Sequence, residues 1–227
     1  MAKKEITVAL AGNPNSGKTT LFNSLTGASQ HVGNWPGVTV EKKEGSCSYQ
    51  GYRLRVVDLP GVYSLTAYSL DEVVARNFVV DEKPDVVVDI VDATNLERNL
   101  YLTVQLLEME ANLVVALNMM DMAESRRYQI DTDELSHLLE VPVVPMVATR
   151  KYGNAELLRE IVNVFEERAA GKKVAVYYGS ELEEHIAELS AIIAQDDQLS
   201  SKFSPRWLAI KLLEEDGEVL QKIEGKT

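Results

Sequence analysis

Apolar stretches of strand length alternate along most of the chain with stretches in which apolar residues recur at helical spacing. Ile6, Val8 and Leu10 alternate with smaller or polar residues and predict a first strand. Nearly continuous apolar runs at residues 85–92 and 112–117 are typical of strands buried on both faces of a parallel sheet. Further strands are expected at residues 39–48, 52–58 and 141–147, the last of them at a non-central position because it contains two prolines.

The segments between these strands have helical periodicity. Leu100, Val104 and Leu107 fall on one face of a helix expected at residues 96–110. Ser69, followed by two acidic residues, marks the start of another helix. Helices are also expected at residues 20–25, 132–139 and 154–168, whereas residues 27–38 are rich in Gly, Asn and Pro and are expected to form a loop.

This order of elements predicts an α/β fold with a mostly parallel sheet covered on both faces. Right-handed crossovers then bring the loops that follow the parallel strands to the carboxyl edge of the sheet. From residue 181 onward the spacing is only helical, with a helix start at Ser204-Pro205. We therefore expect two domains, at residues 1–170 and 171–227, the second of them small and all-helical.

Composition narrows the class of protein. The chain has 227 residues, 45% of them hydrophobic, and a formal net charge of −12, which argues against nucleic acid as the main partner. Cys47 is the single cysteine, so an internal disulfide is excluded and a reducing compartment is favoured. The N-terminus does not read as a signal peptide, and no apolar run reaches the ~20 residues of a membrane-spanning helix. We expect a soluble chain that could be the cytosolic part of a longer protein.

Residues 12–19 read Gly-Asn-Pro-Asn-Ser-Gly-Lys-Thr and fit the phosphate-binding pattern G-x-x-x-x-G-K-[ST]. The pattern lies between the first predicted strand and the first predicted helix. Backbone N–H groups and the helix dipole favour an anion there. Lys18 can reach the β- and γ-phosphates of a nucleotide, and the Thr19 hydroxyl can bind Mg²⁺.

Two further elements have the residue types of a magnesium and γ-phosphate site. Residues 58–61 read Asp-Leu-Pro-Gly at the end of a predicted strand. After a phosphate-binding loop, Asp58 in this position holds Mg²⁺ through water, and the Gly61 N–H contacts the γ-phosphate. The Thr39 hydroxyl can complete the metal shell.

A base-binding element follows a later strand. Asp121, in Asn118-x-x-Asp121, can accept hydrogen bonds from N1 and N2 of guanine, a donor pattern that adenine lacks. The Asn118 amide can hold N7 and brace the surrounding loops, and the Thr149 N–H can donate to O6. The predicted ligand is therefore a guanine nucleotide, GTP or GDP.

These motifs together resemble a Ras-like P-loop GTPase of the translation-factor type. They are more similar still to the cytosolic N-terminal G domain of the ferrous iron transport protein B (FeoB) family. The segments with this resemblance are residues 12–23, 32–41, 58–65 and 95–102. The resemblance covers residues 5–168, and the helical tail is similar to the family's helical domain, which slows GDP release.

The resemblance implies a GTP-hydrolysing switch at the cytoplasmic face of the cell membrane, where it regulates ferrous iron uptake by a transmembrane permease region of the same full-length protein. Whether the chain forms a homo-oligomer stays open. The implied catalytic residues are Asn15, Lys18, Thr39 and Gly61. The implied nucleotide contacts are Gly12, Asn13, Pro14, Asn15, Ser16, Gly17, Lys18, Thr19, Thr20, Gly37, Val38, Thr39, Val40, Glu41, Asp58, Leu59, Pro60, Gly61, Asn118, Met119, Met120, Asp121, Ala148, Thr149 and Arg150.

Departures from the general GTPase pattern predict modest affinity for GDP and slow hydrolysis of GTP. Met119 stands where Lys is usual, which predicts modest GDP affinity and fast release, and Ala148-Thr149-Arg150 replaces Ser-Ala-Lys. Val62 stands where Ras-like proteins have the Gln that orients water, so hydrolysis is expected to be slow. In related families an Asn at the position of Asn15 accompanies activation by K⁺, so we expect K⁺ to bind there and accelerate hydrolysis.

Other interpretations stay open at this point. An RNA- or ribosome-associated GTPase would share these motifs, although the acidic charge disfavours it. A nucleotide-gated interaction module with negligible turnover is compatible with Val62. Trp35 is either a packing anchor or a partner contact. Ordinary structural roles are favoured for His31 and Cys47, and an iron site in the acidic clusters is disfavoured.

Overall fold

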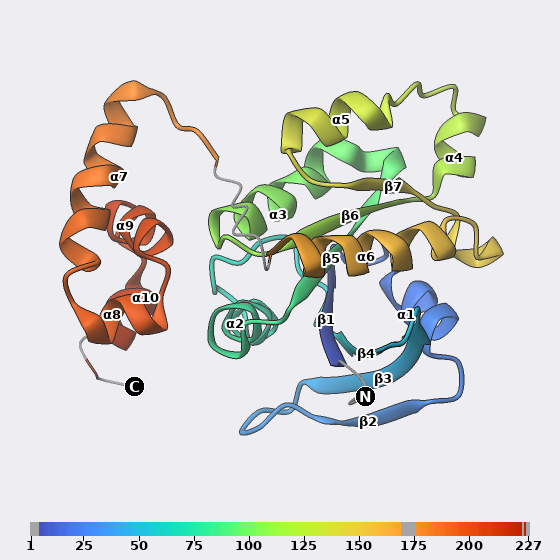
Figure 1. The fold of residues 1–227 in the computed structure, drawn as a ribbon, viewed down its shortest axis with the longest axis horizontal. Coiled ribbons are helices and arrows are strands. Elements are labelled where there is room, and N and C mark those ends of the chain that lie inside the picture. The colour runs from blue at the N-terminus through green and yellow to red at the C-terminus, as the bar shows by residue number, and fades with distance from the viewer. Residues whose placement is uncertain (1–4, 169–175, 224, 226–227) are drawn as a thin grey trace.

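The computed structural model describes residues 5–168, 176–223 and 225. Seven strands form one sheet in the order β2-β3-β4-β1-β5-β6-β7 (Figure 1). The strands are β1 (Glu5–Gly12), β2 (Gln30–Asn34), β3 (Glu41–Tyr49), β4 (Tyr52–Asp58), β5 (Val86–Asp92), β6 (Leu113–Asn118) and β7 (Val143–Pro145). β1 pairs in parallel with β4 and β5, and β5-β6-β7 continue in parallel, whereas β2-β3 and β3-β4 are antiparallel. The expected mostly parallel sheet is confirmed, with the proline-containing β7 at an edge.

Helices cover both faces of the sheet. On one face the core includes residues of α2 (Leu70–Asn77), α3 (Leu96–Glu108) and α4 (Met120–Ser125), with α5 (Thr132–Leu139) packed beside them. On the other face it includes residues of α1 (Lys18–Thr26) and α6 (Asn154–Arg168). β5 and β6 lie between the two cores and are buried almost throughout, which explains their continuous apolar sequences.

Two expectations for the segments between these elements were wrong. Residues 27–38 are not all loop, because β2 lies within them and pairs with β3 from Gln30 opposite Gly45 to Asn34 opposite Glu41. All residues of β2 are exposed, so no apolar alternation marks the strand in the sequence. Helix α4 was also missed; it is short and begins after Met119, which has a left-handed backbone (φ 63°).

The C-terminal segment forms a separate helical domain. Its helices are α7 (Ser180–Ile193), α8 (Asp197–Lys202), α9 (Pro205–Leu213) and α10 (Gly217–Ile223), and Ser204 caps α9 as expected. Their own core includes Ile186, Phe203 and Trp207. The expected domain boundary at residues 170 and 171 lies outside the described residues. No helix in the described ranges has the length and apolarity needed to cross a membrane.

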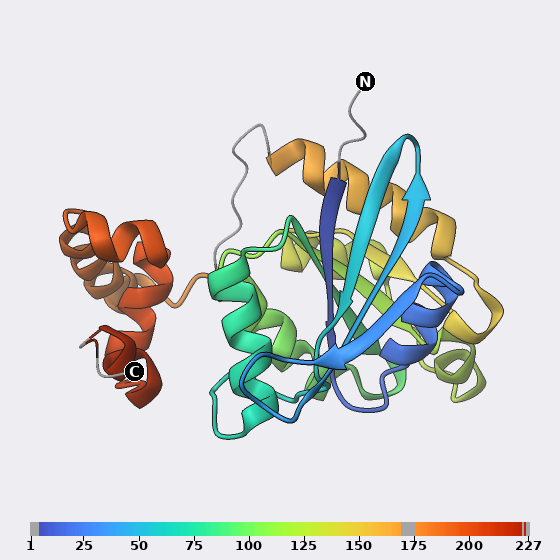
Figure 2. The ribbon, with the colours of Figure 1, turned by 90° about the horizontal axis from the view of Figure 1, so that it is seen from below.

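The helical domain lies beside α2 and its π-helical continuation, Phe78–Glu82 (Figures 1 and 2). Arg76 Nη1 donates to Asp216 Oδ2 over 3.0 Å, and the Arg76 side chain is only 2% exposed. Lys222 Nζ donates to Asn77 Oδ1 over 2.6 Å. Tyr178 also donates to Glu108 of α3. The junction between the domains therefore combines these polar contacts with apolar packing of Val80 and Met109, and it involves the helix that follows Gly61.

Candidate functional site

The phosphate-binding loop connects β1 to α1, as the sequence predicts. Gly17 has a φ of 94°, and a Cβ added there would lie 2.2 Å from Asn118 Nδ2. A Cβ added to Gly12 would lie 2.7 Å from the Ile90 carbonyl oxygen. Neither position has room for a side chain, because Asn118 and Ile90 lie so close to the backbone of the loop. The loop is therefore held against the ends of β5 and β6. Asn15 also has a left-handed backbone, with a φ of 68°, and is exposed.

Lys18 and Asp58 meet at this loop. Lys18 Nζ lies 2.5 Å from Asp58 Oδ1, and both side chains are largely buried. Burial raises the pKa of the Asp58 carboxyl, and the Lys18 ammonium opposes that rise. The cation suited to phosphate and the carboxylate suited to Mg²⁺ therefore share one small region, next to the start of α1.

The residues present fit a magnesium nucleotide. Asp58 and the Thr19 hydroxyl offer the oxygen ligands that Mg²⁺ prefers. Within the described parts of the chain, the buried Asn13 amide and the buried Ser16 hydroxyl have no hydrogen-bond partner. Buried polar groups are nearly always paired, so these two side chains are suited to a polar ligand of the loop.

Residues 58–61 lie directly against the phosphate-binding loop. The Leu59 N–H donates to the Leu10 carbonyl over 3.0 Å, and the Val62 N–H donates to the Gly12 carbonyl over 3.3 Å. Gly61 lies beside Pro14, since a Cβ added to Gly61 would be 3.4 Å from Pro14 Cα. The Val62 side chain is buried in the core with α2 and α3, so it offers no polar group to a water molecule.

The base-binding element is braced by Asn118. Its Nδ2 donates to the Ser16 carbonyl over 2.8 Å, and its Oδ1 accepts from the Ala148 N–H over 3.0 Å. This side chain joins the ends of β1, β6 and β7, as the bracing role requires. Met119 lies next to Gly17, with its Cε 4.0 Å from the position of an added Cβ.

Asp121 lies at the start of α4 and is partly exposed. Its Oδ1 accepts from the Met122 N–H over 3.0 Å, and its Oδ2 lies 3.6 Å from Arg150 Nη2. Thr149 is exposed in the short 3-10 helix Ala148–Arg150. The two elements expected to recognise guanine therefore face one another, and the Arg150 contact was not foreseen from the sequence.

The segment around Thr39 lies beside the rest of the site, because Val38 and Val40 pack against the core that includes Leu59 and Val62. Thr39 is exposed in a turn closed by a hydrogen bond from the Trp35 N–H to the Val40 carbonyl, 2.9 Å long. Between Thr39 and the phosphate-binding loop, both of which are described, the structure has no hydrogen bond. Gly37 and Glu41 are also exposed in this segment. The role of Thr39 in the metal shell stays a prediction.

Trp35 anchors this turn by packing. The side chain is 8% exposed, and its ring meets the Phe78 ring edge to face, with centroids 5.3 Å apart. Lys42 Nζ lies over the Trp35 ring, 4.8 Å from its centroid. Of the two roles considered for Trp35, the structure supports the packing anchor. The turn is thereby attached to the π-helical segment that follows α2.

Residues that order the segment after Gly61 were missed by sequence reasoning. Gln105 Oε1 accepts from the Leu65 N–H over 2.7 Å, although Gln105 lies on the buried side of α3. Glu72 accepts from Ser64 and from the Tyr68 N–H over 3.0 and 2.8 Å. A polar residue among the apolar positions of a helix was the signal for Gln105, but its partner could not be read from the sequence.

Asp89 is a buried carboxyl in the middle of β5. It accepts a hydrogen bond of 2.6 Å from the Thr103 hydroxyl. Burial raises the pKa of Asp89 to about 7, and the Thr103 hydroxyl opposes this rise. Asp89 lies within the sheet rather than among the site residues at its edge, so its effect is on stability.

The chain matches known proteins over both domains. Residues 6–161 match the family described as ferrous iron transport protein B, and residues 178–227 match the FeoB cytosolic helical domain. The Fe(2+) transporter FeoB of Methanocaldococcus jannaschii is 53% identical over 222 residues, which cover 98% of this chain and 32% of that protein. This chain thus spans about a third of the length of that curated relative.

Solved structures are similar as well. The cytosolic domain of the T. maritima FeoB iron transporter in a GDP form has a TM-score of 0.86 at 38% identity, and the match covers 98% of this chain and 85% of that one. The same domain in a GMPPNP form has a TM-score of 0.85 at 38% identity and covers 96% and 84%. The described fold, the phosphate-binding loop and these matches agree: the chain belongs to the ferrous iron transport protein B family.

Proposed function

We propose that this chain binds GTP, hydrolyses it slowly to GDP and phosphate, and acts as a nucleotide-dependent switch on ferrous iron uptake. The iron pathway would belong to a transmembrane region of the full-length protein, at whose cytoplasmic face this chain would lie. The relatives named as Fe(2+) transporters, and the GDP and GMPPNP forms of the T. maritima domain, support this proposal. We assign nucleotide binding to residues 1–170 and the helical domain to residues 171–227, a division supported by α6 ending at Arg168 and α7 beginning at Ser180.

The observation that carries the proposal is the Asn118 brace. One amide fixes the phosphate-binding loop to the loop of Ala148, so the triphosphate end and the base end of the site have a fixed separation. Lys18 would bind the β- and γ-phosphates, Thr19 and Asp58 would hold Mg²⁺, and Asp121 would select guanine. When bound, Mg²⁺ would neutralise part of the negative charge of the phosphates.

Slow hydrolysis follows from Val62. Its side chain is packed in the core, and its N–H is already bonded to the Gly12 carbonyl. An attacking water would be oriented by backbone groups near Gly61 alone, and stabilisation of the developing charge would depend on Lys18 and a further cation. Release of phosphate from GTP by the purified chain tests this; the alternative of a binding module predicts no release above background.

Asn15 is our candidate for the K⁺ ligand. Its side chain is exposed on the loop between Gly12 and Lys18, where an oxygen can bind a monovalent cation beside the phosphates. We expect K⁺ to accelerate phosphate release relative to Na⁺, and Asn15→Gly to reduce that acceleration by about tenfold or more. Gly removes the oxygen but tolerates the φ of 68° at this position. The measurement is the phosphate-release rate in KCl and in NaCl at equal ionic strength.

Asn15→Asp is the matched control for this prediction. The Asp side chain still has an oxygen at this position, and Asp, like Asn, tolerates a left-handed backbone. This variant is expected to keep a response to K⁺. An unchanged K⁺ response in Asn15→Gly would show that the cation is bound elsewhere or acts without this side chain.

The helical domain is expected to slow GDP release through its contacts with α2. Lys222 bonds Asn77 and lies 3.4 Å from Asp81, so Lys222→Met would remove both contacts and keep most of the apolar stem. We expect GDP release to accelerate severalfold, since such a contact contributes about 1 kcal/mol. Stopped-flow release of a fluorescent GDP analogue measures this. Arg53→Met, at an exposed cation of β4 that lies near Glu5, is the control and should leave the rate unchanged.

A further inference from the structure

A cavity of about 270 Å³ lies between the two domains. We refer to it as the junction cavity. Val79, Lys83 and Met109 line it from the sheet domain, and Lys202, Phe203 and Trp207 line it from the helical domain. Val87 and Asn112, at the amino ends of β5 and β6, also belong to its lining, whereas the phosphate-binding loop lies at the carboxyl edge of the sheet. The junction cavity is therefore separate from the nucleotide site.

The lining contains a buried hydrogen-bond donor without a partner. Trp207 is 3% exposed, and within the described ranges its indole Nε1 has no acceptor. The Trp207 ring stacks on Phe203, with centroids 5.7 Å apart, so the indole is held in place. A buried N–H without an acceptor is unfavourable because it has lost its hydrogen bond to water. An acceptor supplied by a ligand would remove this cost.

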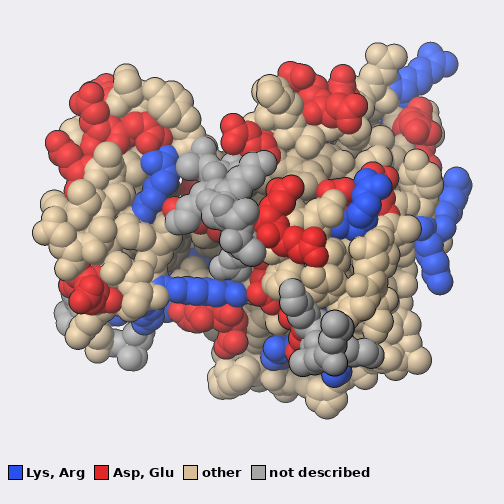
Figure 3. All heavy atoms as spheres, in the orientation of Figure 1, with Lys and Arg blue, Asp and Glu red and all other residues tan. Residues whose placement is uncertain are grey.

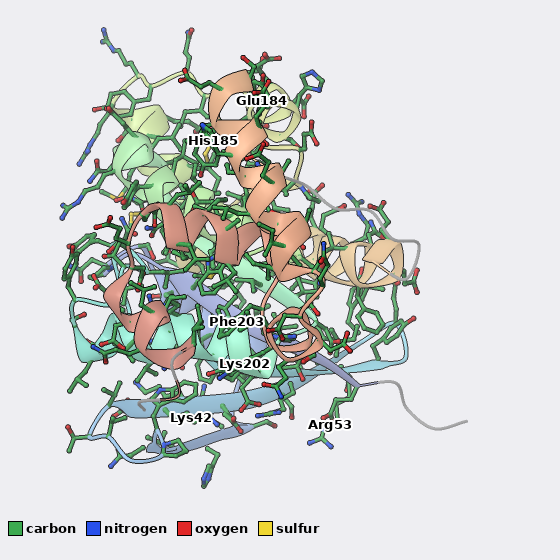
Figure 4. The ribbon with its side chains drawn as sticks, turned by 90° about the vertical axis from the view of Figure 1, so that its left-hand side faces the viewer. Lys42, Arg53, Glu184, His185, Lys202 and Phe203 are labelled. Atoms are coloured by element: carbon green, nitrogen blue, oxygen red, sulfur yellow. The ribbon has the colours of Figure 1, made fainter. Side chains whose placement is uncertain are left out.

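The lining also contains two ammonium groups without a carboxylate partner. Lys83 Nζ donates to the Ser201 carbonyl over 3.0 Å, and Lys202 Nζ lies 5.2 Å from the Phe203 ring centroid. Both side chains are exposed at the mouth of the cavity, and neither is in an ion pair among the described residues. Figure 4 shows Lys202 and Phe203 next to each other on the helical domain, and Figure 3 shows basic side chains together with acidic ones along the junction of the two lobes.

One carboxylate, Glu110, lines the same cavity. Its charge acts on Arg206 of the helical domain: the pKa of Arg206 is raised by its hydrogen bonds with Glu183 and, to a smaller extent, by Glu110. Arg206 is already paired with Glu183, with Nη1 2.7 Å from Oε2, so Glu110 keeps its charge at the cavity. Two ammonium groups then face one carboxylate, and together with the indole N–H they favour an acceptor with a negative charge.

We propose that the junction cavity binds a small organic carboxylate with an apolar body. The carboxylate accepts from Trp207 Nε1 and is balanced by Lys83 and Lys202, and the apolar body packs against Val79 and Phe203. The volume lies just below the ~300–1,000 Å³ range of most small-molecule sites, which limits the ligand to a short chain or a single ring. Because both domains contribute to the lining, the ligand holds them together.

The test is an NMR titration of the chain with sodium hexanoate. Trp35 and Trp207 are the two tryptophans, so two indole N–H resonances are present, and Trp35→Phe assigns them. We expect the Trp207 resonance to move downfield in a saturable manner and the Trp35 resonance to stay in place. Hexanamide, which has the same chain without the charge, is expected to bind at least about tenfold more weakly.

Two double variants distinguish the effect of the cavity lysines from the effect of removing two positive charges elsewhere on the surface. In Lys83→Gln/Lys202→Gln, hexanoate is expected to bind at least about tenfold more weakly. Arg53→Gln/Arg159→Gln removes two exposed cations on other parts of the surface and should leave the affinity unchanged. The proposal is overturned if hexanoate causes no saturable shift of Trp207, if hexanamide binds as well, or if the lysine variant keeps the affinity.

Discussion

Asp121→Asn is expected to lower the affinity of the chain for GDP by about a hundredfold or more and to create affinity for xanthosine diphosphate. A carboxylate accepts from both N1–H and the N2 amino group of guanine, whereas an amide has one acceptor and places its own NH₂ against these donors. Xanthine has an oxygen at C2 in place of the amino group, so the amide can donate to it. Titration with fluorescent GDP and XDP analogues measures both changes.

The position of Asp121 makes this variant informative. Its carboxylate is partly exposed and lies 3.6 Å from Arg150, so the substitution leaves no buried group unpaired and the fold should be retained. Asp133→Asn, the same chemical change on the exposed start of α5, is the control and should not alter GDP binding. Retention of wild-type GDP affinity in Asp121→Asn would mean that the base is recognised by other residues.

Asp89→Asn is expected to stabilise the chain at pH 8 and to remove part of the pH dependence of its stability. The pKa of Asp89 is about 7 in the folded state, above its ordinary value of 3.8. Between these two values the folded state holds a proton that the unfolded state has released, so stability falls as pH rises and levels off above about 7. A difference of this size corresponds to about 4 kcal/mol of stability lost between pH 3 and pH 8.

Asparagine is neutral at every pH and keeps an oxygen for the Thr103 hydroxyl. The stability of Asp89→Asn relative to wild type should therefore increase by about 3 kcal/mol between pH 5 and pH 8. Urea unfolding at a series of pH values gives this difference. Thr103→Val removes the hydrogen bond that opposes the pKa rise, and it should extend the fall of stability to higher pH. A difference between Asp89→Asn and wild type that is independent of pH would contradict the account.

The sheet could be predicted from the sequence because its central strands are marked twice, by continuous apolar residues and by the motifs that follow them. β5 and β6 are buried on both faces, and the loops at the ends of β1, β4 and β6 contain the Gly, Asp and Asn residues that we expect to bind a nucleotide. These loops converge by topology alone. The phosphate-binding loop, Asp58 and Asn118 were therefore expected to lie together, as they do.

The features that could not be predicted depend on contacts between residues far apart in the chain, which leave no pattern in the sequence around either partner. β2 is held by backbone pairing with β3 and has no buried side chain to give it an apolar pattern. Gln105 and Leu65 are far apart along the chain, and so are Arg76 and Asp216. Their pairing follows from how α3 and the helical domain pack, which helical periodicity does not determine. The turn that contains Thr39 is held by Trp35 packing against Phe78, a contact that the sequence does not mark, and the role of Thr39 at the metal stays a prediction.

The central claim is that Asp121 selects the purine whose phosphates lie over Lys18. The most direct measurement is a titration of the purified chain with GDP, GTP and ATP in the presence of Mg²⁺. We predict saturable binding of GDP and GTP and at least about hundredfold weaker binding of ATP. Binding of ATP with an affinity equal to that of GTP, or binding of none of the three, would contradict it.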